Sequence, residues 1–354
     1  MLILATLSLA SYRPTNTAQA QNHKKPSRTL KKSSWQSFLQ EEFTQLEKRY
    51  PNKIGLYIKD LNTGEEYALR ADENWYLAST VKIPIALEVL RQVDAKIISL
   101  EDEIQITLDD FVDGNGPLKS MRPGEQVTVR FLMEQMIALS DNMASDMLIR
   151  VVGLDKVNAL VKELSPSGIS PITTLKDVRR YLYSELHPKG FELSGQNMLK
   201  LKQVHSPIKR LTEFASLLHL DKKKMNLPNI HEAYEAYYRK GLNSGTPRSY
   251  SKILEAAWEG KLLSPPSRDF LVRTMLKTQT GNKRIKAGLT QPWVFAHKTG
   301  TQYRRIGDVG YLWNPQDMDR KPIIVVSYVR DGNESSSSKI LKEVAEIISR
   351  SGVL

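Results

Sequence analysis

Ser79 and Lys82 form the first pair of residues in the sequence whose types and spacing could do chemistry. They stand three positions apart in an almost entirely apolar stretch, residues 76–90. A helix over this stretch is predicted to be buried, with the two Cβ atoms roughly 5–6 Å apart. Burial makes a lysine lose its proton more readily, and a serine needs a neighbouring base to become a nucleophile. The pair therefore predicts nucleophilic catalysis by Ser79 with Lys82 assisting.

A structural alternative is that Ser79 only caps the helix, because a serine hydroxyl often accepts a hydrogen bond from a free backbone N–H at a helix start. The pattern Ser-x-x-Lys is weak by itself. It occurs three more times, at Ser206/Lys209, Ser249/Lys252 and Ser336/Lys339. The residues beyond this pair therefore have to decide between a cap and a nucleophile.

Two further short motifs follow along the chain, Ser140-Asp141-Asn142 and Lys298-Thr299-Gly300. Each has an ordinary structural interpretation. The first could end one helix and cap the next. The second could lie on an exposed edge strand, where a lysine discourages aggregation. Their order after Ser79 and Lys82 is what makes them informative together.

Taken in order, the three motifs resemble those of the class A β-lactamases and their relatives among the penicillin-recognising serine hydrolases. The resemblance covers residues 54–164 and 243–330 and leaves the middle of the chain unmatched. It implies an α/β fold of the β-lactamase/transpeptidase type, with an antiparallel sheet and a helical subdomain. No Gly-x-Ser-x-Gly occurs, so the α/β-hydrolase nucleophile elbow is absent.

The resemblance also implies roles for individual residues. Ser79 attacks the substrate carbonyl, Lys82 helps to remove the serine proton, and Ser140 passes a proton to the leaving nitrogen. Asn142 holds Lys82 and the substrate side chain, and the backbone N–H groups of Ser79 and Thr301 stabilise the oxyanion. The substrate carboxylate is bound by Lys298, Thr299, Gly300 and Thr301. Arg304 or Arg305 adds a positive charge to that anion site. It implies no cofactor.

The sequence departs from the family at the glutamate that activates the deacylating water in β-lactamases. The signature Glu-x-x-Leu-Asn is absent, although residues 242–247, "LNSGTP", resemble the end of the loop that normally carries it. Glu232 and Glu235, just upstream, are the candidates for this base. The alternative is that both are ordinary exposed helix residues.

Three functions therefore stay open. The leading prediction is a class A β-lactamase that opens β-lactam rings through a Ser79 acyl-enzyme and hydrolyses it, as in β-lactam catabolism and antibiotic resistance. The second is a D-Ala-D-Ala carboxypeptidase or penicillin-binding protein acting on peptidoglycan peptides. The third is a non-catalytic protein that binds the cell envelope through its basic surface.

Composition narrows the class of protein and its location. The 354 residues include no cysteine, which excludes disulfides and Cys-based zinc sites, and no His-Glu-x-x-His motif occurs, so we expect no metal. Residues 1–20 are typical of a secretory leader, which predicts an exported, periplasmic or secreted protein beginning near Gln21. The net charge of +12 is interpreted as solvated surface plus a basic tether over residues 21–34, without nucleic-acid binding. We expect a monomer with no membrane span after cleavage, whose partner is a small β-lactam or a peptidoglycan peptide.

The elements that must position these motifs are predicted from periodicity. Helices are expected over residues 35–49, 128–139, 143–152, 154–164, 247–259 and 338–348. Strands are expected through Ile54, Leu56 and Ile58, through Tyr67 and Leu69, and over residues 293–302, 306–313 and 322–329. Strands at both ends with helices between them predict one sheet built from both ends of the chain. The α/β part is assigned to residues 35–90 and 250–354 and the helical part to residues 91–249, within which residues 172–240 carry charge and helical propensity but no motif.

Overall fold

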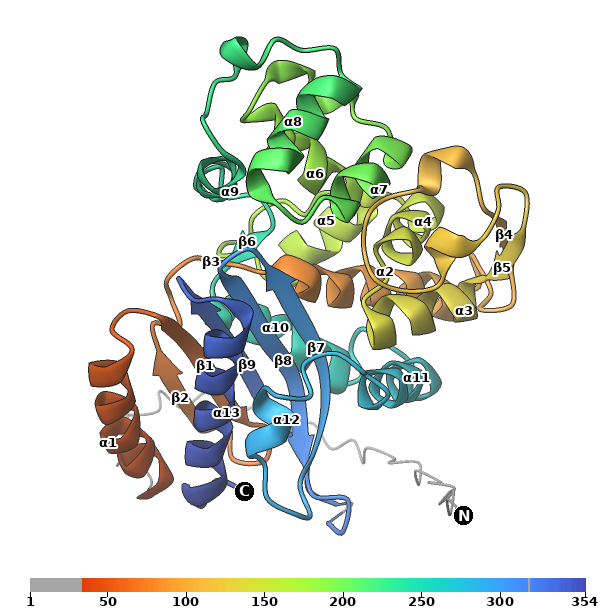
Figure 1. Cartoon of the computed structure of the whole chain (residues 1–354). Helices are drawn as coiled ribbons and strands as arrows, with labels where there is room; N and C mark the ends of the chain where they lie inside the picture. The colour runs from red at the N-terminus through yellow and green to blue at the C-terminus, as the bar shows by residue number, and fades with distance from the viewer. Residues whose placement is uncertain (1–33, 318) are drawn as a thin grey trace, which may run out of the picture. The chain divides into compact units, whose positions relative to one another are not determined.

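A five-stranded sheet joins the two ends of the part of the chain that the computed structural model describes, residues 34–317 and 319–354. β1 (Ile54–Asp60) and β2 (Glu66–Leu69) come from one end, and β7 (Val294–Gln302), β8 (Arg305–Trp313) and β9 (Ile323–Arg330) come from the other. The strand order is β2-β1-β9-β8-β7, and every neighbouring pair is antiparallel (Figure 1). The predicted fold class is confirmed. The predicted leader and all but the last residue of the predicted tether lie outside the described residues.

Alternation along β1 assigns its side chains to two apolar clusters. Ile54, Leu56 and Ile58 pack with residues of α1 (Ser34–Arg49) and α13 (Glu334–Arg350), which cover one face of the sheet (Figure 1). Tyr57 points to the other face and joins the cluster that includes α10 (Pro247–Trp258). This two-residue period is what a strand buried on both faces requires.

The last helix, α13, starts earlier than predicted. The Asn333 side chain accepts a hydrogen bond from the backbone N–H of Ser336 and so caps the helix.

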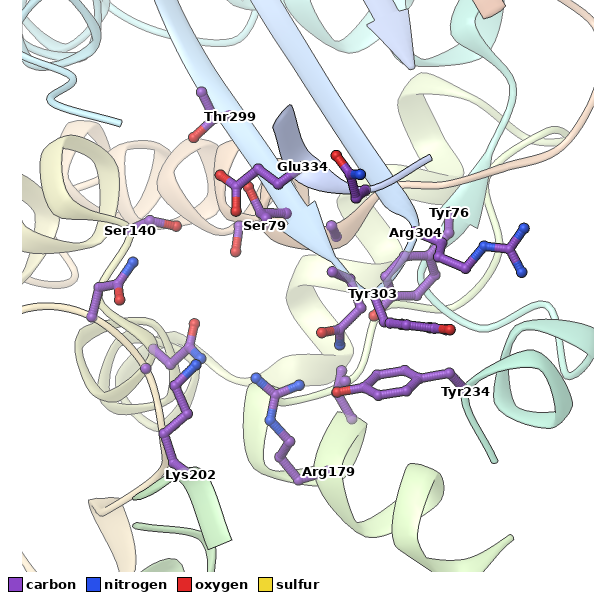
Figure 2. A pocket seen from close by; sticks show the side chains of 18 of the residues that line it. Tyr76, Ser79, Ser140, Arg179, Lys202, Tyr234, Thr299, Tyr303, Arg304 and Glu334 are labelled. Carbon is purple, nitrogen blue, oxygen red and sulfur yellow. The ribbon is translucent and has the colours of Figure 1, made fainter. Parts of the chain in front are cut away.

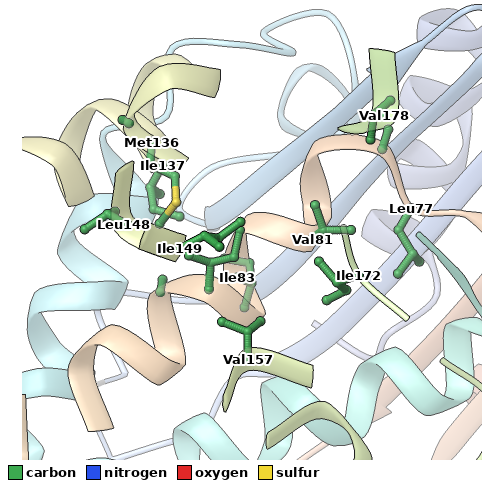
Figure 3. Packing of buried hydrophobic residues seen from close by; sticks show 14 of the residues in the cluster. Leu77, Val81, Ile83, Met136, Ile137, Leu148, Ile149, Val157, Ile172 and Val178 are labelled. Atoms are coloured by element: carbon green, nitrogen blue, oxygen red, sulfur yellow. The ribbon is translucent and has the colours of Figure 1, made fainter. Parts of the chain in front are cut away.

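The helical part surrounds α2 (Lys82–Asp94), whose residues are nearly all buried. Ile83 of α2 belongs to one apolar cluster with Ile137, Leu148 and Ile149 (Figure 3). The other elements of this part are α3 (Val129–Glu134), α4 (Asn142–Val152), α5 (Leu154–Leu164), α11 (Pro265–Leu276) and the small ribbon of β4 (Glu103–Gln105) with β5 (Gln126–Thr128). The short α12 (Ile285–Gly288) instead packs against α13 on the sheet. The helix predicted over residues 128–139 is not one continuous α-helix, because it widens into a π turn at Gln135–Leu139.

Residues 172–240, called the insert from here on, form four short helices: α6 (Leu175–Ser184), α7 (Gly195–Gln203), α8 (Pro207–Leu217) and α9 (Ile230–Arg239). They are the green helices of Figure 1. Each is preceded by a polar side chain that accepts a backbone hydrogen bond from the first turn, namely Thr174, Ser194, Ser206 and Asn229. Such caps satisfy N–H groups that the helix itself cannot pair.

The insert is held at both of its ends by buried polar side chains. Where it begins, the carboxylate of Asp146 accepts hydrogen bonds from the backbone N–H groups of Leu175 (2.6 Å) and Lys176 (2.8 Å). Where it returns, Asn243 donates to Thr173 Oγ1 (2.9 Å), just before β6 (Ser244–Gly245) pairs with β3 (Trp75–Tyr76). The insert therefore starts beside α4 and ends beside the strand that leads to Ser79.

None of the described helices is both long and apolar enough to span a membrane.

Candidate active site

Ser79 lies on a 3₁₀ turn, Ala78–Val81, that leads directly into α2. Its side chain is partly exposed and lines a cavity of about 930 Å³ (Figure 2). The cap hypothesis for Ser79 is wrong, because Leu77 and Val81 precede the turn and α2 and neither helix start has a capping side chain. By contrast, Ser206 of another Ser-x-x-Lys pair does cap its helix.

The turn that carries Ser79 is fixed from several directions. Thr80 Oγ1 donates to the carbonyl of Leu77 (2.7 Å) and lies 2.9 Å from Tyr328 Oη, while Tyr250 Oη donates to the carbonyl of Thr80 (2.7 Å). Gly300 of β7 packs directly against the turn, since a Cβ at this position would lie 2.7 Å from the Leu77 carbonyl oxygen. The glycine of the third motif thus allows the sheet edge to approach the nucleophile.

Lys82 is fully buried at the first position of α2. Its Nζ donates to the carbonyl of Ser140 (2.7 Å), to Ser140 Oγ (3.2 Å) and to Asn142 Oδ1 (2.8 Å). Burial lowers the pKa of Lys82 to about 7, although the carboxylates of Asp141 and Asp146 act in the opposite direction. A large neutral fraction therefore exists at physiological pH, as a general base requires. The three hydrogen bonds join Lys82 to the second motif and not to Ser79.

Ser140 stands between the two lysines of the site. It follows the π turn with a left-handed backbone (φ 60°), a conformation that costs roughly 1–3 kcal/mol in a non-glycine residue. Its Oγ accepts hydrogen bonds from Lys82 Nζ (3.2 Å) and from Lys298 Nζ (2.9 Å). Because both lone pairs are engaged, the hydroxyl hydrogen is left to be donated into the cavity.

The other two residues of the second motif have structural partners. Asp141 Oδ1 accepts a hydrogen bond from the backbone N–H of Ala144 (3.1 Å), so the capping interpretation is correct for this residue. Asn142 accepts from Lys82 and donates to the carbonyl of Asp113 (2.7 Å). These bonds fix the amide of Asn142 at the cavity wall.

Lys298 lies on the edge strand β7, but it is fully buried. The hypothesis that it protects an exposed edge is therefore wrong. Besides Ser140 Oγ, its Nζ donates to the carbonyl of Thr299 (3.0 Å). Burial holds the pKa of Lys298 well below its usual range, and the charges of Lys82 and Arg284 lower it further. Thr299 itself lies 2.5 Å, Oγ1 to Oγ1, from Thr280 and lines the cavity.

Arg284 is a further cation of the site that the sequence did not suggest. It is 2% exposed, and its guanidinium donates to the carbonyls of Gly300 (3.0 Å) and Gly307 (3.2 Å) and to Thr301 Oγ1 (2.7 Å). It also pairs with the carboxylate of Glu334 at 3.2 Å. Its Nε has no partner among the described residues. A permanent positive charge is thus fixed behind the third motif.

Arg304 and Arg305, the arginines expected at the anion site, have different surroundings. Arg304 lines the cavity and Arg305 does not. Arg305 pairs with Glu235 (3.0 Å) and with Asp331 (2.9 Å), and Arg304 approaches the same two carboxylates at 3.7 Å and 3.5 Å. These pairs tie the β7–β8 turn to α9.

Neither candidate for the deacylation base is brought to Ser79. Glu232 is exposed and accepts a hydrogen bond from Asn229 Nδ2 (3.0 Å) at the start of α9, and Glu235 is engaged by the two arginines. Among the described residues that line the cavity, the acidic ones are Asp331 and Glu334.

Over residues 34–317 and 319–354, no three His, Asp or Glu side chains gather into a set that could hold a metal ion.

The sequence is similar to known enzymes along nearly its whole length. The model of the β-lactamase enzyme family matches residues 38–351. β-Lactamase VEB-1 of Pseudomonas aeruginosa is 25% identical over 307 residues, which cover 83% of this chain and 84% of that protein.

Two solved structures share the fold at low sequence identity. An acyl-enzyme complex of a PBP-A mutant with penicillin G has a TM-score of 0.65 and 23% identity, covering 88% of this chain and 95% of that one. An ancestral class A β-lactamase has a TM-score of 0.65 and 24% identity, covering 88% and 98%. The likeness in fold therefore extends to β-lactamases and to PBP-A alike.

Proposed function

Because the chain belongs to the β-lactamase enzyme family, we propose that it is a serine acyl-transfer enzyme that cleaves peptidoglycan peptides ending in D-Ala-D-Ala. β-Lactams acylate the same serine, Ser79, and leave it slowly. Peptide cleavage is the second of the three functions predicted from the sequence. It is proposed here in place of the leading prediction, repeated β-lactam hydrolysis. The non-catalytic alternative is disfavoured by the buried lysines, since burying two amines without a carboxylate partner is costly in a protein that only binds.

Acylation uses the groups around Ser140. Ser79 Oγ attacks the carbonyl carbon while its proton passes to the neutral fraction of Lys82. The backbone N–H groups of Ser79 and Thr301 hold the oxyanion. When the C–N bond breaks, Ser140 gives its hydroxyl proton to the leaving nitrogen and regains one from the lysines that donate to it. The acyl-enzyme complex of PBP-A with penicillin G supports the same chemistry here.

We assign the carboxylate of the substrate to the part of the cavity that lies next to Lys298. Thr299 and Thr301 offer hydroxyl groups there, and Arg284 adds a charge that no pH change removes. Because the Glu334 carboxylate is 68% exposed, it compensates the buried charge of Arg284 only in part. The wall therefore keeps a net attraction for an anion.

Peptides and β-lactams differ in what remains after acylation. The D-alanine released from a peptide diffuses away, so water can enter beside Ser140 and give its proton to the neutral amine of Lys82. The nitrogen of an opened β-lactam stays attached to the acyl group and occupies that place. A β-lactam ester then needs a second base, within about 2.6–3.2 Å of a water on another side.

One observation carries the proposal of slow release: neither Glu232 nor Glu235 lines the cavity, and both have partners elsewhere. Among the described residues, the acidic ones that do line it are Glu334, which pairs with Arg284, and Asp331, which pairs with Arg305. An acid held by an arginine is a weak base, since the positive charge favours its ionised form.

The test is release of D-alanine from diacetyl-Lys-D-Ala-D-Ala, measured beside labelling by a fluorescent penicillin. We expect wild type to release D-alanine and to carry the label on the peptide that contains Ser79, and we expect Ser79→Ala to do neither. No D-alanine from wild type, or equal release from Ser79→Ala, would refute the peptidase assignment.

We further propose that the protein works outside the cytoplasm, where its peptide substrate is found. The small-x-small residues Ala18-Gln19-Ala20 support cleavage before Gln21. N-terminal sequencing of protein from the native cell tests this, and an intact Met1 would contradict it.

A further inference from the structure

The cavity does not end at the catalytic groups but continues along the insert. Arg179 of α6, Lys202 of α7 and Arg210 of α8 line it there, and we call these three residues the basic wall. Figure 2 shows Arg179 and Lys202 on the side of Ser79 that lies away from Thr299. The cavity thus has cations at two places, with the nucleophile between them.

The charge of the basic wall is only partly compensated. Arg179 pairs through Nε with Asp113 (2.6 Å), and Arg210 donates through Nε to the carbonyl of Val204 (2.8 Å). Within residues 34–317 and 319–354, Lys202 and Arg210 have no carboxylate within ion-pair distance, and the terminal nitrogens of Arg179 have no acceptor. Three positive charges therefore face the cavity against one negative charge.

Arg179 is built into the wall rather than left on the surface. Its side chain is 16% exposed, and the ion pair with Asp113 fixes one edge of the guanidinium. Figure 2 shows the side chain pointing into the pocket beside the ring of Tyr234. Since the planar fork of an arginine matches the two oxygens of a carboxylate, the free edge is preorganised for such a group.

The order of the groups along the cavity sets the direction of a bound substrate. The C-terminal carboxylate belongs beside Thr299, Thr301 and Arg284, which line the cavity, and the reacting carbonyl belongs at Ser79. The acyl part of the substrate must then run past Asn142 toward the insert, because Asn142, Arg179 and Lys202 line the same cavity.

We propose that the basic wall is a subsite for a carboxylate carried on the acyl side of the scissile bond. The preferred substrate is then a peptide with two anionic groups, one at its C-terminus and one on a side chain upstream. This inference rests on the proposed function for the direction of the substrate, and it names the substrate class for the same site.

The test uses two peptides that differ in one charge, Nα-acetyl-Nε-acetyl-Lys-D-Ala-D-Ala and Nα-acetyl-Nε-succinyl-Lys-D-Ala-D-Ala. Binding is measured by calorimetry on Ser79→Ala, which cannot be acylated. We expect the succinyl peptide to bind about tenfold more tightly, as for one hydrogen bond to a charged group. In Ser79→Ala/Lys202→Gln and Ser79→Ala/Arg179→Gln the ratio of the two dissociation constants should fall toward one.

Lys200→Gln in the same background is the matched control, because Lys200 is an exposed lysine of α7 that does not line the cavity. Lys202 is exposed, so its substitution keeps the test valid if Arg179→Gln fails to fold. Equal binding of the two peptides, or a ratio that Lys202→Gln leaves unchanged, would overturn the subsite.

Release of D-alanine by wild type separates this inference from the proposed function. Tighter binding of the succinyl peptide without any release would refute the peptidase and support the subsite. Release of D-alanine from both peptides, together with equal binding of the two, would support the peptidase and refute the subsite.

Discussion

Lys82 and Lys298, on the motif side of the cavity, have surroundings opposite to those of Arg179 and Lys202, on the insert side. The first two are fully buried, donate only to neutral oxygens and have lowered pKa values. The second two are more exposed, and Arg179 has a carboxylate partner. Burial without a counter-charge makes an amine able to exchange a proton, whereas exposure leaves it charged. The amines of the motif side can thus exchange protons, whereas the cations of the insert side keep their charge and can only bind an anion.

The largest effect is expected from Lys82→Ala. Removing the base should lower the acylation rate by roughly 10²–10⁴-fold. The measurement is the rate of labelling by a fluorescent penicillin, with circular dichroism to show that the fold is intact and Lys200→Gln as the control for the loss of a positive charge. An unchanged rate in folded Lys82→Ala would make Lys82 a packing residue.

The second-largest effect tests whether β-lactam release is slow because no carboxylate is placed to activate the deacylating water. Leu175 lines the cavity as the first residue of α6, and its N–H is held by Asp146, whose charge acts on Lys82. It lies outside the two apolar clusters, and the first turn of a helix favours a carboxylate. We expect Leu175→Glu to speed deacylation by about 10²-fold, as general base catalysis allows.

The control for this variant is Leu175→Gln, which has the same shape without the base. The readout is the lifetime of the penicillin adduct, followed by mass spectrometry of the intact protein. If Gln and Glu shorten the lifetime equally, the effect comes from looser packing and not from base catalysis.

A smaller effect is expected at the other lysine of the motif side. Lys298→Ala should weaken capture of carboxylate-bearing substrates by about ten- to a hundredfold, the range for a hydrogen bond to a charged group. The measurement compares acylation by benzylpenicillin and by its methyl ester. Wild type should prefer the free acid, and the variant should lose this preference. A variant that keeps the preference while both rates fall would mean that Lys298 acts on the chemical step alone.

The smallest effect is a pH dependence. Because burial lowers the pKa of Lys82 to about 7, the proton-free amine increases as the pH rises through 7. The acylation rate should therefore increase about tenfold between pH 6 and pH 8 and then level off. A rate that falls over this range would show that the charged lysine is the active form.

The sequence predicted the sheet and the three motifs because both depend on local patterns. The two-residue alternation of β1 and the apolar run of α2 are visible without tertiary information. The four insert helices were not resolved, although Thr174, Ser194, Ser206 and Asn229 are ordinary capping residues at their starts.

What the sequence could not indicate is how distant segments meet. Arg284 reaches the site only because the chain before β7 folds against the carbonyls of Gly300 and Gly307. Glu232 and Glu235 were candidates by their position in the chain, and the orientation of α9 presents Ile230, His231 and Tyr234 to the cavity instead. A helical residue three or four positions from another shares its face, but which face meets the cavity depends on packing.

We expect the motif side to acylate Ser79 readily, and among the described residues no acid at the cavity wall is free to release a β-lactam quickly. The direct measurement is a stopped-flow trace with nitrocefin, combined with mass spectrometry of the intact protein. We predict one burst of colour equal to the amount of enzyme, followed by a stable adduct of one nitrocefin per chain. Sustained turnover with no accumulated adduct would contradict this prediction and show that the protein is a β-lactamase.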